Sequence, residues 1–219
     1  MYRLTYGLGL EGTPDEITAA VLADWPDAAE ALLAARALVP GCKREVLSHE
    51  AAVLYALARQ YDHEGACVLE IGTALGYTAA ILALAVPRAD LVTLDPKPGE
   101  YERAATHLAP LANVLAVQQH SWDYLAAYRG PALDMVFVDG DHNQVERDLG
   151  WLGWLKMGGL MIFHDYSPVE SRRPCPHVYE VVNQFGATLG READVLVVDS
   201  RLRGMAGWYR QDGESWPRG

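Results

Sequence analysis

The sequence has few cysteines, a shortage of basic residues and no long apolar run. Its three cysteines (Cys42, Cys67 and Cys175) are odd in number and widely spaced. This excludes a disulfide framework and a cysteine zinc motif, and it fits a reducing compartment. Only 18 basic residues face 29 acidic ones, which gives a net charge of −11. Such a surface repels phosphate backbones, so we expect no nucleic-acid partner.

Signals for membranes and export are also missing. The longest uncharged apolar run, residues 77–87, has roughly half the length needed to span a bilayer. The first 16 residues contain no basic stretch followed by an apolar block, so they do not resemble a secretory signal. We therefore expect a cytoplasmic protein without a membrane partner.

The apolar content is sufficient for one globular domain, since half of the 219 residues are apolar. Thr13-Pro-Asp-Glu16 is typical of a helix start, and helical spacing runs from there to Val39. A second helical pattern covers residues 46–61. We expect an N-terminal helical addition over residues 1–62 and one Rossmann-like unit over residues 63–219. The addition is expected to cover the ligand site of that unit as a lid.

Beyond Gly65, short apolar runs alternate with helical patterns. The predicted strands cover residues 67–71, 91–94, 114–117, 135–138, 160–163 and 195–198, with a last edge strand at 207–210. Uninterrupted apolar strands separated by helices indicate a parallel sheet covered on both faces. With right-handed crossovers, this predicts an α/β fold: a doubly wound, mostly parallel, seven-stranded Rossmann-like sheet.

The turn after the first of these strands reads "VLEIGTALGYT". Gly72 allows a tight turn and a close ligand, and Gly76 lets the next helix pack against the strand. The stretch is no P-loop, because no Gly-Lys-Ser/Thr follows, and Ala74 replaces the middle glycine of a dinucleotide motif. Glu70 would repel a pyrophosphate. The alternative is that the glycines only make a tight turn.

Asp95 ends the next strand, where an acidic residue typically accepts hydrogen bonds from ribose hydroxyls. Together with Asp95, the Glu70-x-Gly72-x-x-x-Gly76-x-Thr78 pattern resembles the cofactor site of class I S-adenosylmethionine-dependent methyltransferases. "FVDGDH" and "WLKMGGLMIFHDY" are similar to small bacterial O-methyltransferases of the family 24 type, and the resemblance covers about residues 46–165. It implies S-adenosyl-L-methionine as the cofactor, with contacts from Glu70, Gly72, Thr73, Gly76, Tyr77, Thr78, Asp95, Ser121, Trp122 and Asp139.

Ionisable residues follow two neighbouring strands of the predicted sheet. Asp139, Asp141 and His142 follow one strand, and His164 and Asp165 follow the next. Adjacent parallel strands lie about 5 Å apart, so these side chains can share one ion. We predict a divalent-cation site at Asp139, His164 and Asp165, with magnesium favoured by the carboxylates and manganese, iron or zinc allowed by the histidine. Catechol-type O-methyltransferases, which this pattern resembles, have an acidic residue in place of His164.

A general base is expected in the same turn. His142 lies three residues after Asp139, at the position that matches the general-base lysine of the catechol-type enzymes, and its reference pKa of about 6.5 suits the task. Asp141 is the alternative base, although it could equally cap the next helix. His164 could be a hydrogen-bonded core histidine. Residues 146–148 are interpreted as a solvated helix face.

These patterns leave several functions open. The first hypothesis is metal-assisted O-methylation of a small hydroxylated acceptor, a sugar or secondary metabolite. The second is a metal-independent methyltransferase with a histidine base, and the third is a cofactor-binding protein without catalysis. Glu70 and Ala74 disfavour a dinucleotide oxidoreductase. Arg172 and Arg173 could receive an acidic substrate, and a homodimer is allowed by aromatic residues expected on the surface near the end of the chain: Trp208, Tyr209 and Trp216.

Overall fold

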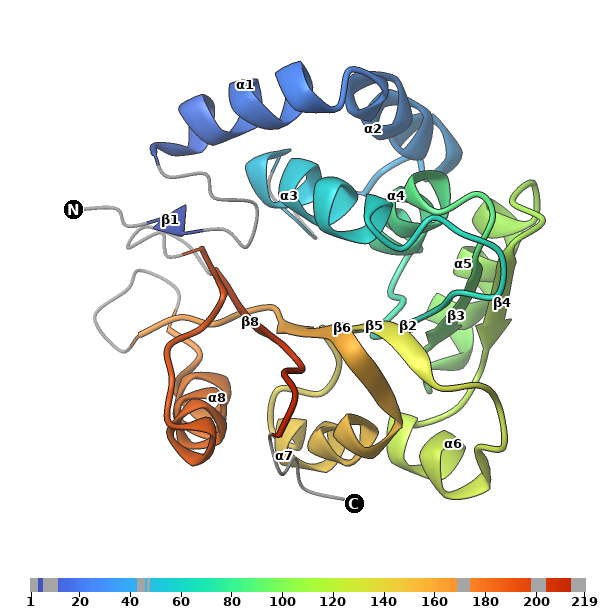
Figure 1. The fold of residues 1–219 in the computed structure, drawn as a ribbon. Coiled ribbons are helices and arrows are strands. Elements are labelled where there is room, and N and C mark those ends of the chain that lie inside the picture. The colour runs from blue at the N-terminus through green and yellow to red at the C-terminus, as the bar shows by residue number, and fades with distance from the viewer. Residues whose placement is uncertain are drawn as a thin grey trace.

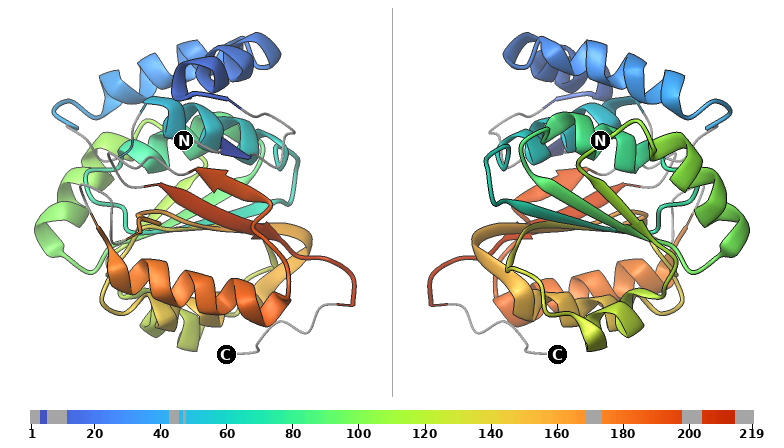
Figure 2. Two further views of the ribbon diagram at one scale, coloured as in Figure 1. Left: turned by 90° about the vertical axis from the view of Figure 1, so that its left-hand side faces the viewer. Right: turned by 90° about the vertical axis from the view of Figure 1, so that its right-hand side faces the viewer.

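The computed structural model describes residues 4–5, 12–42, 46, 48–168, 174–197 and 204–213. Arg172, Arg173 and Trp216 lie outside these ranges. An eight-stranded sheet with the order β1-β7-β8-β6-β5-β2-β3-β4 runs through the centre of the molecule (Figure 1). Helices lie on both of its faces (Figure 2).

The strands are short and mostly apolar. They are β1 Leu4–Thr5, β2 Cys67–Ile71, β3 Asp90–Leu94, β4 Val114–Val117, β5 Leu133–Val138, β6 Leu155–Phe163, β7 Val195–Val197 and β8 Met205–Tyr209. Strands β2 to β6 pair in parallel, whereas β8 runs antiparallel to both β6 and β7. Every residue of β2 and β5 is buried, as expected of central strands covered on both faces. This confirms the doubly wound, mostly parallel sheet, to which the two-residue β1 adds an edge.

The last strand does not lie at the edge of the sheet, where the sequence pattern had placed it. Gly207 pairs with Ile162 of β6 on one side and with Val195 of β7 on the other, so β8 is an interior strand. Local sequence shows that a segment is extended but not which strands it pairs with. Trp208 is only 4% exposed, so the prediction of an exposed aromatic residue there was wrong. Tyr209 is partly buried.

The helices are α1 Pro14–Asp24, α2 Asp27–Leu38, α3 Ser48–Arg59, α4 Tyr77–Ala85, α5 Pro98–Leu108, α6 Ser121–Ala127, α7 Val145–Asp148, the 3-10 helix η1 Leu149–Trp154 and α8 Pro176–Leu189. Helices α3, α4 and α5 cover one face of the sheet, and α6, α7 and α8 cover the other (Figure 2). In the described part of the chain, no helix has the length and apolar character that a bilayer span requires.

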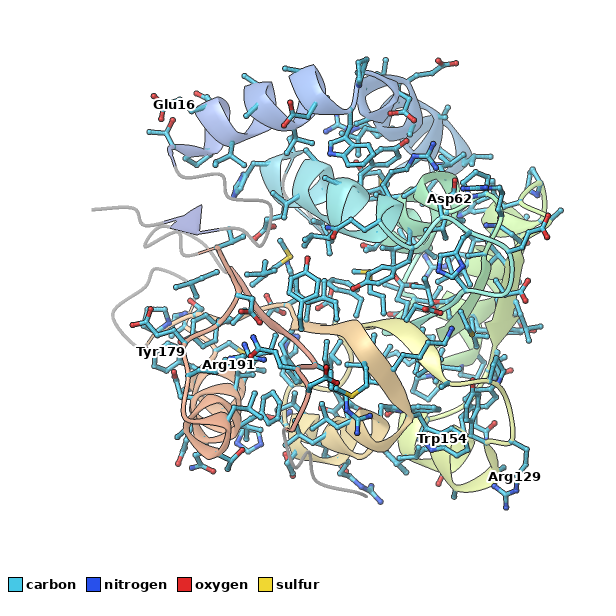
Figure 3. The ribbon with its side chains drawn as sticks, viewed as in Figure 1. Glu16, Asp62, Arg129, Trp154, Tyr179 and Arg191 are labelled. Atoms are coloured by element: carbon cyan, nitrogen blue, oxygen red, sulfur yellow. The ribbon has the colours of Figure 1, made fainter. Side chains whose placement is uncertain are left out.

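The first predicted helix is in fact two helices. It begins as expected with a capping box, in which the Thr13 side chain accepts from the Glu16 amide and the Glu16 carboxylate accepts from the Thr13 amide. Glu16 is labelled at the start of this helix in Figure 3. It ends at Asp24, because Pro26 has no N–H and disfavours helical geometry in the residue before it. Trp25 accordingly has φ −127° and ψ 76°.

Helix α3 is packed on two sides. It lies between the sheet and the outer layer that α1 and α2 form (Figure 1). Ten of its 12 residues are buried, so it is an interior helix rather than an amphipathic surface helix. Side chains of α1, α2 and α3 share one apolar core with α4 and the sheet. The division into residues 1–62 and 63–219 stays a prediction.

Candidate active site

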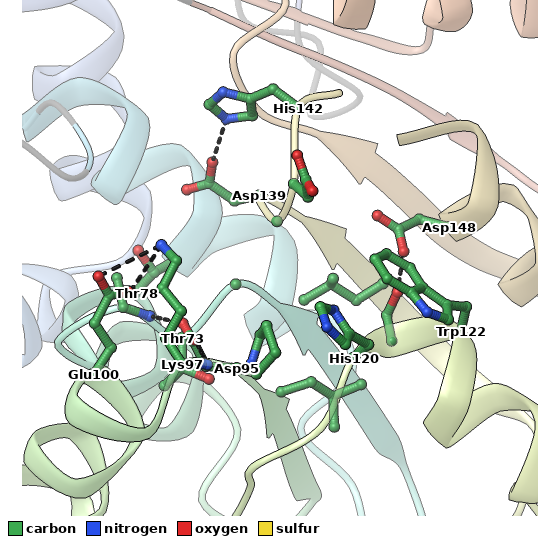
Figure 4. A pocket seen from close by; sticks show the side chains of 18 of the residues that line it. Thr73, Thr78, Asp95, Lys97, Glu100, His120, Trp122, Asp139, His142 and Asp148 are labelled. Carbon is green, nitrogen blue, oxygen red and sulfur yellow. Dashed lines mark hydrogen bonds and ion pairs between the residues drawn. The ribbon is translucent and has the colours of Figure 1, made fainter. Parts of the chain in front are cut away.

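A cavity of about 750 Å³ opens at the carboxyl ends of the central strands (Figure 4). The chain passes from β2 through β3 to β4 on one side of the sheet and then crosses to β5 on the other side of β2. Such a reversal of strand order is where open α/β sheets bind ligands. The cavity wall contains most of the predicted site residues: Gly72, Thr73, Thr78, Asp95, Ser121, Trp122, Asp139, Asp141, His142 and Asp165.

Gly72 brings the ends of β2 and β5 together. Its φ is +98°, and its amide donates to the carbonyl of Leu94 at 2.9 Å. A Cβ atom at this position would lie 2.1 Å from the carbonyl oxygen of Asp139, closer than any side chain tolerates. The neighbouring Asp139 amide donates to the carbonyl of Ile71 at 2.8 Å. A glycine is therefore required for the backbone of Asp139 to lie where it does.

Replacing Gly72 with alanine is expected to lower the free energy of unfolding by about 2–4 kcal/mol, since left-handed strain and steric overlap each cost roughly 1–3 kcal/mol. Urea unfolding measures this change. The matched control is Gly99→Ala, because a Cβ atom on Gly99 would meet no other atom within 4 Å and the residue lies in the first turn of α5. Equal stability of the two variants would contradict the role given to Gly72.

Asp95 is held in a fixed orientation on the cavity wall. Its Oδ2 accepts from the amide of Ala74 at 2.9 Å, and its Oδ1 accepts from the amide of Lys97 at 2.9 Å. The residue is 4% exposed, and burial raises the pKa of its carboxyl group above the usual range. The carboxylate thus joins the turn after β2 to the turn after β3 and still borders the cavity (Figure 4).

Glu70 lies beneath the cavity rather than on its wall. It is fully buried and accepts a hydrogen bond from the Thr93 hydroxyl, which lies 2.5 Å from the Thr73 hydroxyl. Glu70 therefore holds the loop after β2 from below. Gly76 and Tyr77 are also absent from the wall; the Tyr77 hydroxyl accepts from Nε of Arg36 at 3.4 Å.

Aromatic rings border the cavity on the α6 side. The rings of His120 and Trp122, which Figure 4 labels, are stacked, and their centroids are 4.4 Å apart. The guanidinium of Arg147 lies 4.1 Å from the centroid of the Trp122 ring. A flat, electron-rich surface of this kind suits an aromatic base.

Asp148 is a buried acid of this cavity, and the interpretation of residues 146–148 as a solvated face was wrong for it. Asp148 is 1% exposed and accepts a hydrogen bond from the Ser121 hydroxyl. Burial raises its pKa to about 7. The spacing could have revealed this, because Asp148 lies three residues after Val145 and four before Leu152, both of which are buried.

Two histidines and two carboxylates meet at the opposite end of the cavity. Nε2 of His142 lies 2.5 Å from Asp165 and 3.9 Å from Asp139. Nδ1 of His164 lies 3.2 Å from Asp139 and 3.6 Å from Asp165. One ligand atom each from Asp139, His164 and Asp165 lies within 4.8 Å of the others. The predicted residues of the cation site are therefore neighbours in space, and this donor set fits a divalent cation.

Asp165 reaches this cluster through an unusual backbone conformation. Its φ is +56°, in the left-handed region that residues other than glycine rarely adopt. Strain of this kind costs about 1–3 kcal/mol and is concentrated at functional sites. With this conformation, the side chains of two consecutive residues both lie in the cluster. His164 contacts Asp139, and Asp165 contacts His142.

The carboxylates hold both histidines in the protonated form. Asp139 and Asp165 raise the pKa of His142 to about 11. Burial opposes a charge on His164, yet Asp139 and Glu50 raise its pKa well above the usual value. Nε2 of His164 lies 3.4 Å from Oε2 of Glu50. Glu50 was not among the predicted residues, because an acid in the first turn of a helix is ordinary.

Asp141 is exposed and stabilises the turn before α7. Its Oδ1 accepts from the amide of Asn143 at 3.0 Å, which is an Asx turn. The residue that caps α7 is Gln144, whose side chain makes no capping bond. Asp141 thus orders the loop that carries His142, and it also borders the cavity.

Comparisons with known proteins agree with this geometry. Residues 69–166 match a family model described as a methyltransferase domain, of family 24. No curated protein matches the sequence. Among solved structures, cofactor-bound Rv0187 from Mycobacterium tuberculosis is 24% identical, with a TM-score of 0.67 over 93% of this chain and 100% of that one.

Two further similar structures are O-methyltransferases. TomG from Streptomyces achromogenes, involved in tomaymycin synthesis and solved with S-adenosylmethionine, is 22% identical (TM-score 0.61, 84% of this chain and 89% of that one). An enzyme from Bacillus cereus, solved with S-adenosylhomocysteine, is 17% identical (TM-score 0.64, 90% and 100%). Residues 69–166 therefore resemble a methyltransferase domain of family 24, and the sheet order and the cavity at the switch point fit this resemblance.

Proposed function

We propose that the protein transfers a methyl group from S-adenosylmethionine to a hydroxyl oxygen of a small acceptor, with a divalent cation bound at Asp139, His164 and Asp165. The observation that carries the proposal is one continuous cavity that has Asp95 in one wall and the Asp139–His142–Asp165 cluster in another. When bound, S-adenosylmethionine supplies a sulfonium methyl group for in-line displacement by the acceptor oxygen. The chain's residues have to align the two reactants and remove a proton.

For the cofactor, we propose contacts from the turn after β2 and from the walls of the cavity. Gly72, Thr73 and Thr78 would lie along the amino-acid part, Asp95 would accept from the ribose hydroxyls, and Ser121 and Trp122 would face the adenine. The preset carboxylate of Asp95 supports this, since both of its oxygens are already oriented by backbone amides. Glu70 would act from beneath by fixing Thr73 through Thr93.

Replacing Asp95 with asparagine is expected to weaken S-adenosylhomocysteine binding by about 10- to 100-fold. Hydrogen bonds to a charged group contribute roughly 1.5–3 kcal/mol, and an amide would turn its NH₂ toward the amide of Ala74 or Lys97. Calorimetric titration measures the change. Asp90→Asn is the control, because Asp90 is an exposed acid at the opposite end of the same strand. Unchanged affinity of the Asp95 variant would contradict the ribose contact.

For the cation, we propose Asp139, His164 and Asp165 as ligands. The three side chains offer two carboxylates and one imidazole nitrogen, a set that suits magnesium, manganese, iron or zinc. A divalent cation bound there would lower the pKa of an acceptor hydroxyl. The residues themselves would fix the position of that hydroxyl at the end of the cavity.

For the general base, we propose His142, with Asp141 as the alternative. Paired with Asp139 and Asp165, His142 is protonated at neutral pH and takes up no proton. A divalent cation bound to Asp139 and Asp165 would compete with His142 for these two carboxylates. The pKa of His142 would then fall toward the ordinary value of about 6.5. A metal-independent enzyme would need a histidine base that is neutral in the present arrangement, and the raised pKa values of His142 and His164 disfavour this.

Three carboxyl groups border the cavity near the proposed acceptor end: Asp139, Asp141 and Asp165. This favours a neutral or cationic acceptor that carries hydroxyl groups, such as a sugar or a secondary metabolite, over an anionic one. A cytoplasmic location, assembly as a homodimer and a lid role for residues 1–62 stay predictions from the sequence. Of the described residues, none from α1 to α3 lines the cavity.

The test is release of S-adenosylhomocysteine from a panel of small hydroxylated acceptors. The enzyme is first chelated and then supplied with magnesium or manganese. We expect turnover only after metal addition. Equal turnover with and without chelator would select the metal-independent alternative, and tight cofactor binding without transfer to any acceptor would select a protein that binds the cofactor without catalysis.

A further inference from the structure

Glu50 is a buried acid of α3 that does not line the cavity. It is 1% exposed, and it lies on a helix that is packed between the sheet and the outer helices. A buried carboxylate without a partner is costly, so its partner decides its role. One partner is His164, which follows β6 and is 6% exposed. The pair therefore joins the N-terminal helices to the acidic cluster.

The geometry divides the two nitrogens of His164 between two tasks. Nε2 faces Oε2 of Glu50 at 3.4 Å, away from the cluster. Nδ1 faces the cluster, 3.2 Å from Asp139 and 3.6 Å from Asp165. A carboxylate on one imidazole nitrogen keeps a proton there, so a cation that displaces the proton on the other nitrogen can bind at that second nitrogen. Histidines that bind metals nearly always have such a partner on the second nitrogen.

We infer that Glu50 is the positioning residue of the proposed cation site: it accepts a hydrogen bond from Nε2 of His164 and so directs Nδ1 toward Asp139 and Asp165, where a bound cation would take the place of the Nδ1 proton. The inference rests on the proposed function, because it assumes a cation at these three residues. It gives α3 a task beyond that of a lid. It also explains how a buried imidazole fits at residue 164: a metal ion on Nδ1 and the Glu50 carboxylate on Nε2 would satisfy both of its nitrogens.

The test measures metal affinity without turnover. Manganese and zinc are titrated calorimetrically, each alone, into the metal-free full-length chain and into its Glu50→Ala and Glu50→Gln variants. We expect Glu50→Ala to weaken binding by about 10- to 100-fold, the usual effect of removing such a partner. Glu50→Gln should lose less, because the amide oxygen still accepts the Nε2 proton. Glu50→Gln also keeps the size and shape of the buried side chain, so it serves as the test variant if Glu50→Ala does not fold.

The matched control is Glu146→Gln. Glu146 also pairs with a histidine, His177, at 2.9 Å, but on the surface between α7 and α8. Metal affinity should not change in this variant. S-adenosylhomocysteine affinity should be the same in all of these proteins, since Glu50 and Glu146 do not line the cavity. That measurement also reports whether each variant is folded.

A second readout is the protonation of His164 in the zinc-bound wild-type protein. Nitrogen-15 NMR of the imidazole is expected to show the proton on Nε2 and none on Nδ1. If the wild-type chain binds metal while Glu50→Ala binds it equally well, the inference fails and the proposed cation site remains. If the proton in the zinc-bound protein lies on Nδ1, His164 is no ligand through that atom, and the inference fails together with the proposed role of His164. If the wild-type chain binds cofactor but no metal, the cation site itself fails, and the inference fails with it.

Discussion

Replacing Asp139 with asparagine is expected to lower kcat by about 100-fold or more while the cofactor still binds. Asp139 faces His142 and His164 and lines the cavity, as Asp165 also does. Losing its charge removes a proposed cation ligand and disturbs the proposed base, and loss of a general base alone costs roughly 10²- to 10⁴-fold. Steady-state kinetics with saturating metal measure the effect.

The control for this experiment is Asp24→Asn, because Asp24 is an exposed acid at the end of α1, remote from the cavity. S-adenosylhomocysteine affinity of the Asp139 variant should change little, since the amide keeps the size of the side chain and the backbone contacts of residue 139. A variant with normal kcat would remove Asp139 from both the cation site and the base. Comparing His142→Ala with Asp141→Asn then assigns the base, because only one of them should flatten the acidic limb of the pH profile.

The sequence was most informative about the central strands of the sheet. The apolar runs predicted the central strands β2 and β5 within two residues, because a strand that is buried on both faces needs an uninterrupted apolar run. Strand β6 begins at Leu155, five residues before the predicted run. Pro26 shows the limit for helices, since periodicity continued through a break that the proline imposes. The place of β8 was out of reach, because pairing depends on distant segments and not on local pattern.

The candidate site was predictable where topology alone brings residues together. Asp139, His164 and Asp165 follow two strands that pair in parallel, so their proximity follows from the fold. The functions of buried acids were harder to predict. Glu70 has the sequence position of a cofactor ligand but is bonded to Thr93 in the interior. Glu50 depends on how α3 packs against the end of β6, a contact between segments 114 residues apart.

The burial of Asp148, which was not predicted from the sequence, should make the stability of the folded protein depend on pH. Burial raises its pKa to about 7 in the folded protein, against about 3.8 for an unperturbed carboxyl group. The folded state therefore holds the proton more tightly than the unfolded chain. Its contribution to stability is fully present below about pH 4 and is lost as the pH rises through 7. A shift of this size corresponds to up to about 4 kcal/mol, at roughly 1.4 kcal/mol per pKa unit.

Asp148→Asn should accordingly stabilise the cofactor-free protein, and only toward neutral pH. The asparagine is uncharged at every pH, and its oxygen still accepts from the Ser121 hydroxyl. We expect equal stability of variant and wild type near pH 4, a difference that grows up to pH 7, and a plateau of up to about 4 kcal/mol above it. Urea unfolding at a series of pH values measures the difference, with Asp123→Asn, an exposed acid of the neighbouring helix α6, as the control. A difference that is constant with pH would mean that Asp148 ionises normally in the folded state, and the cavity would then hold a full negative charge on the side where an adenine is proposed to bind.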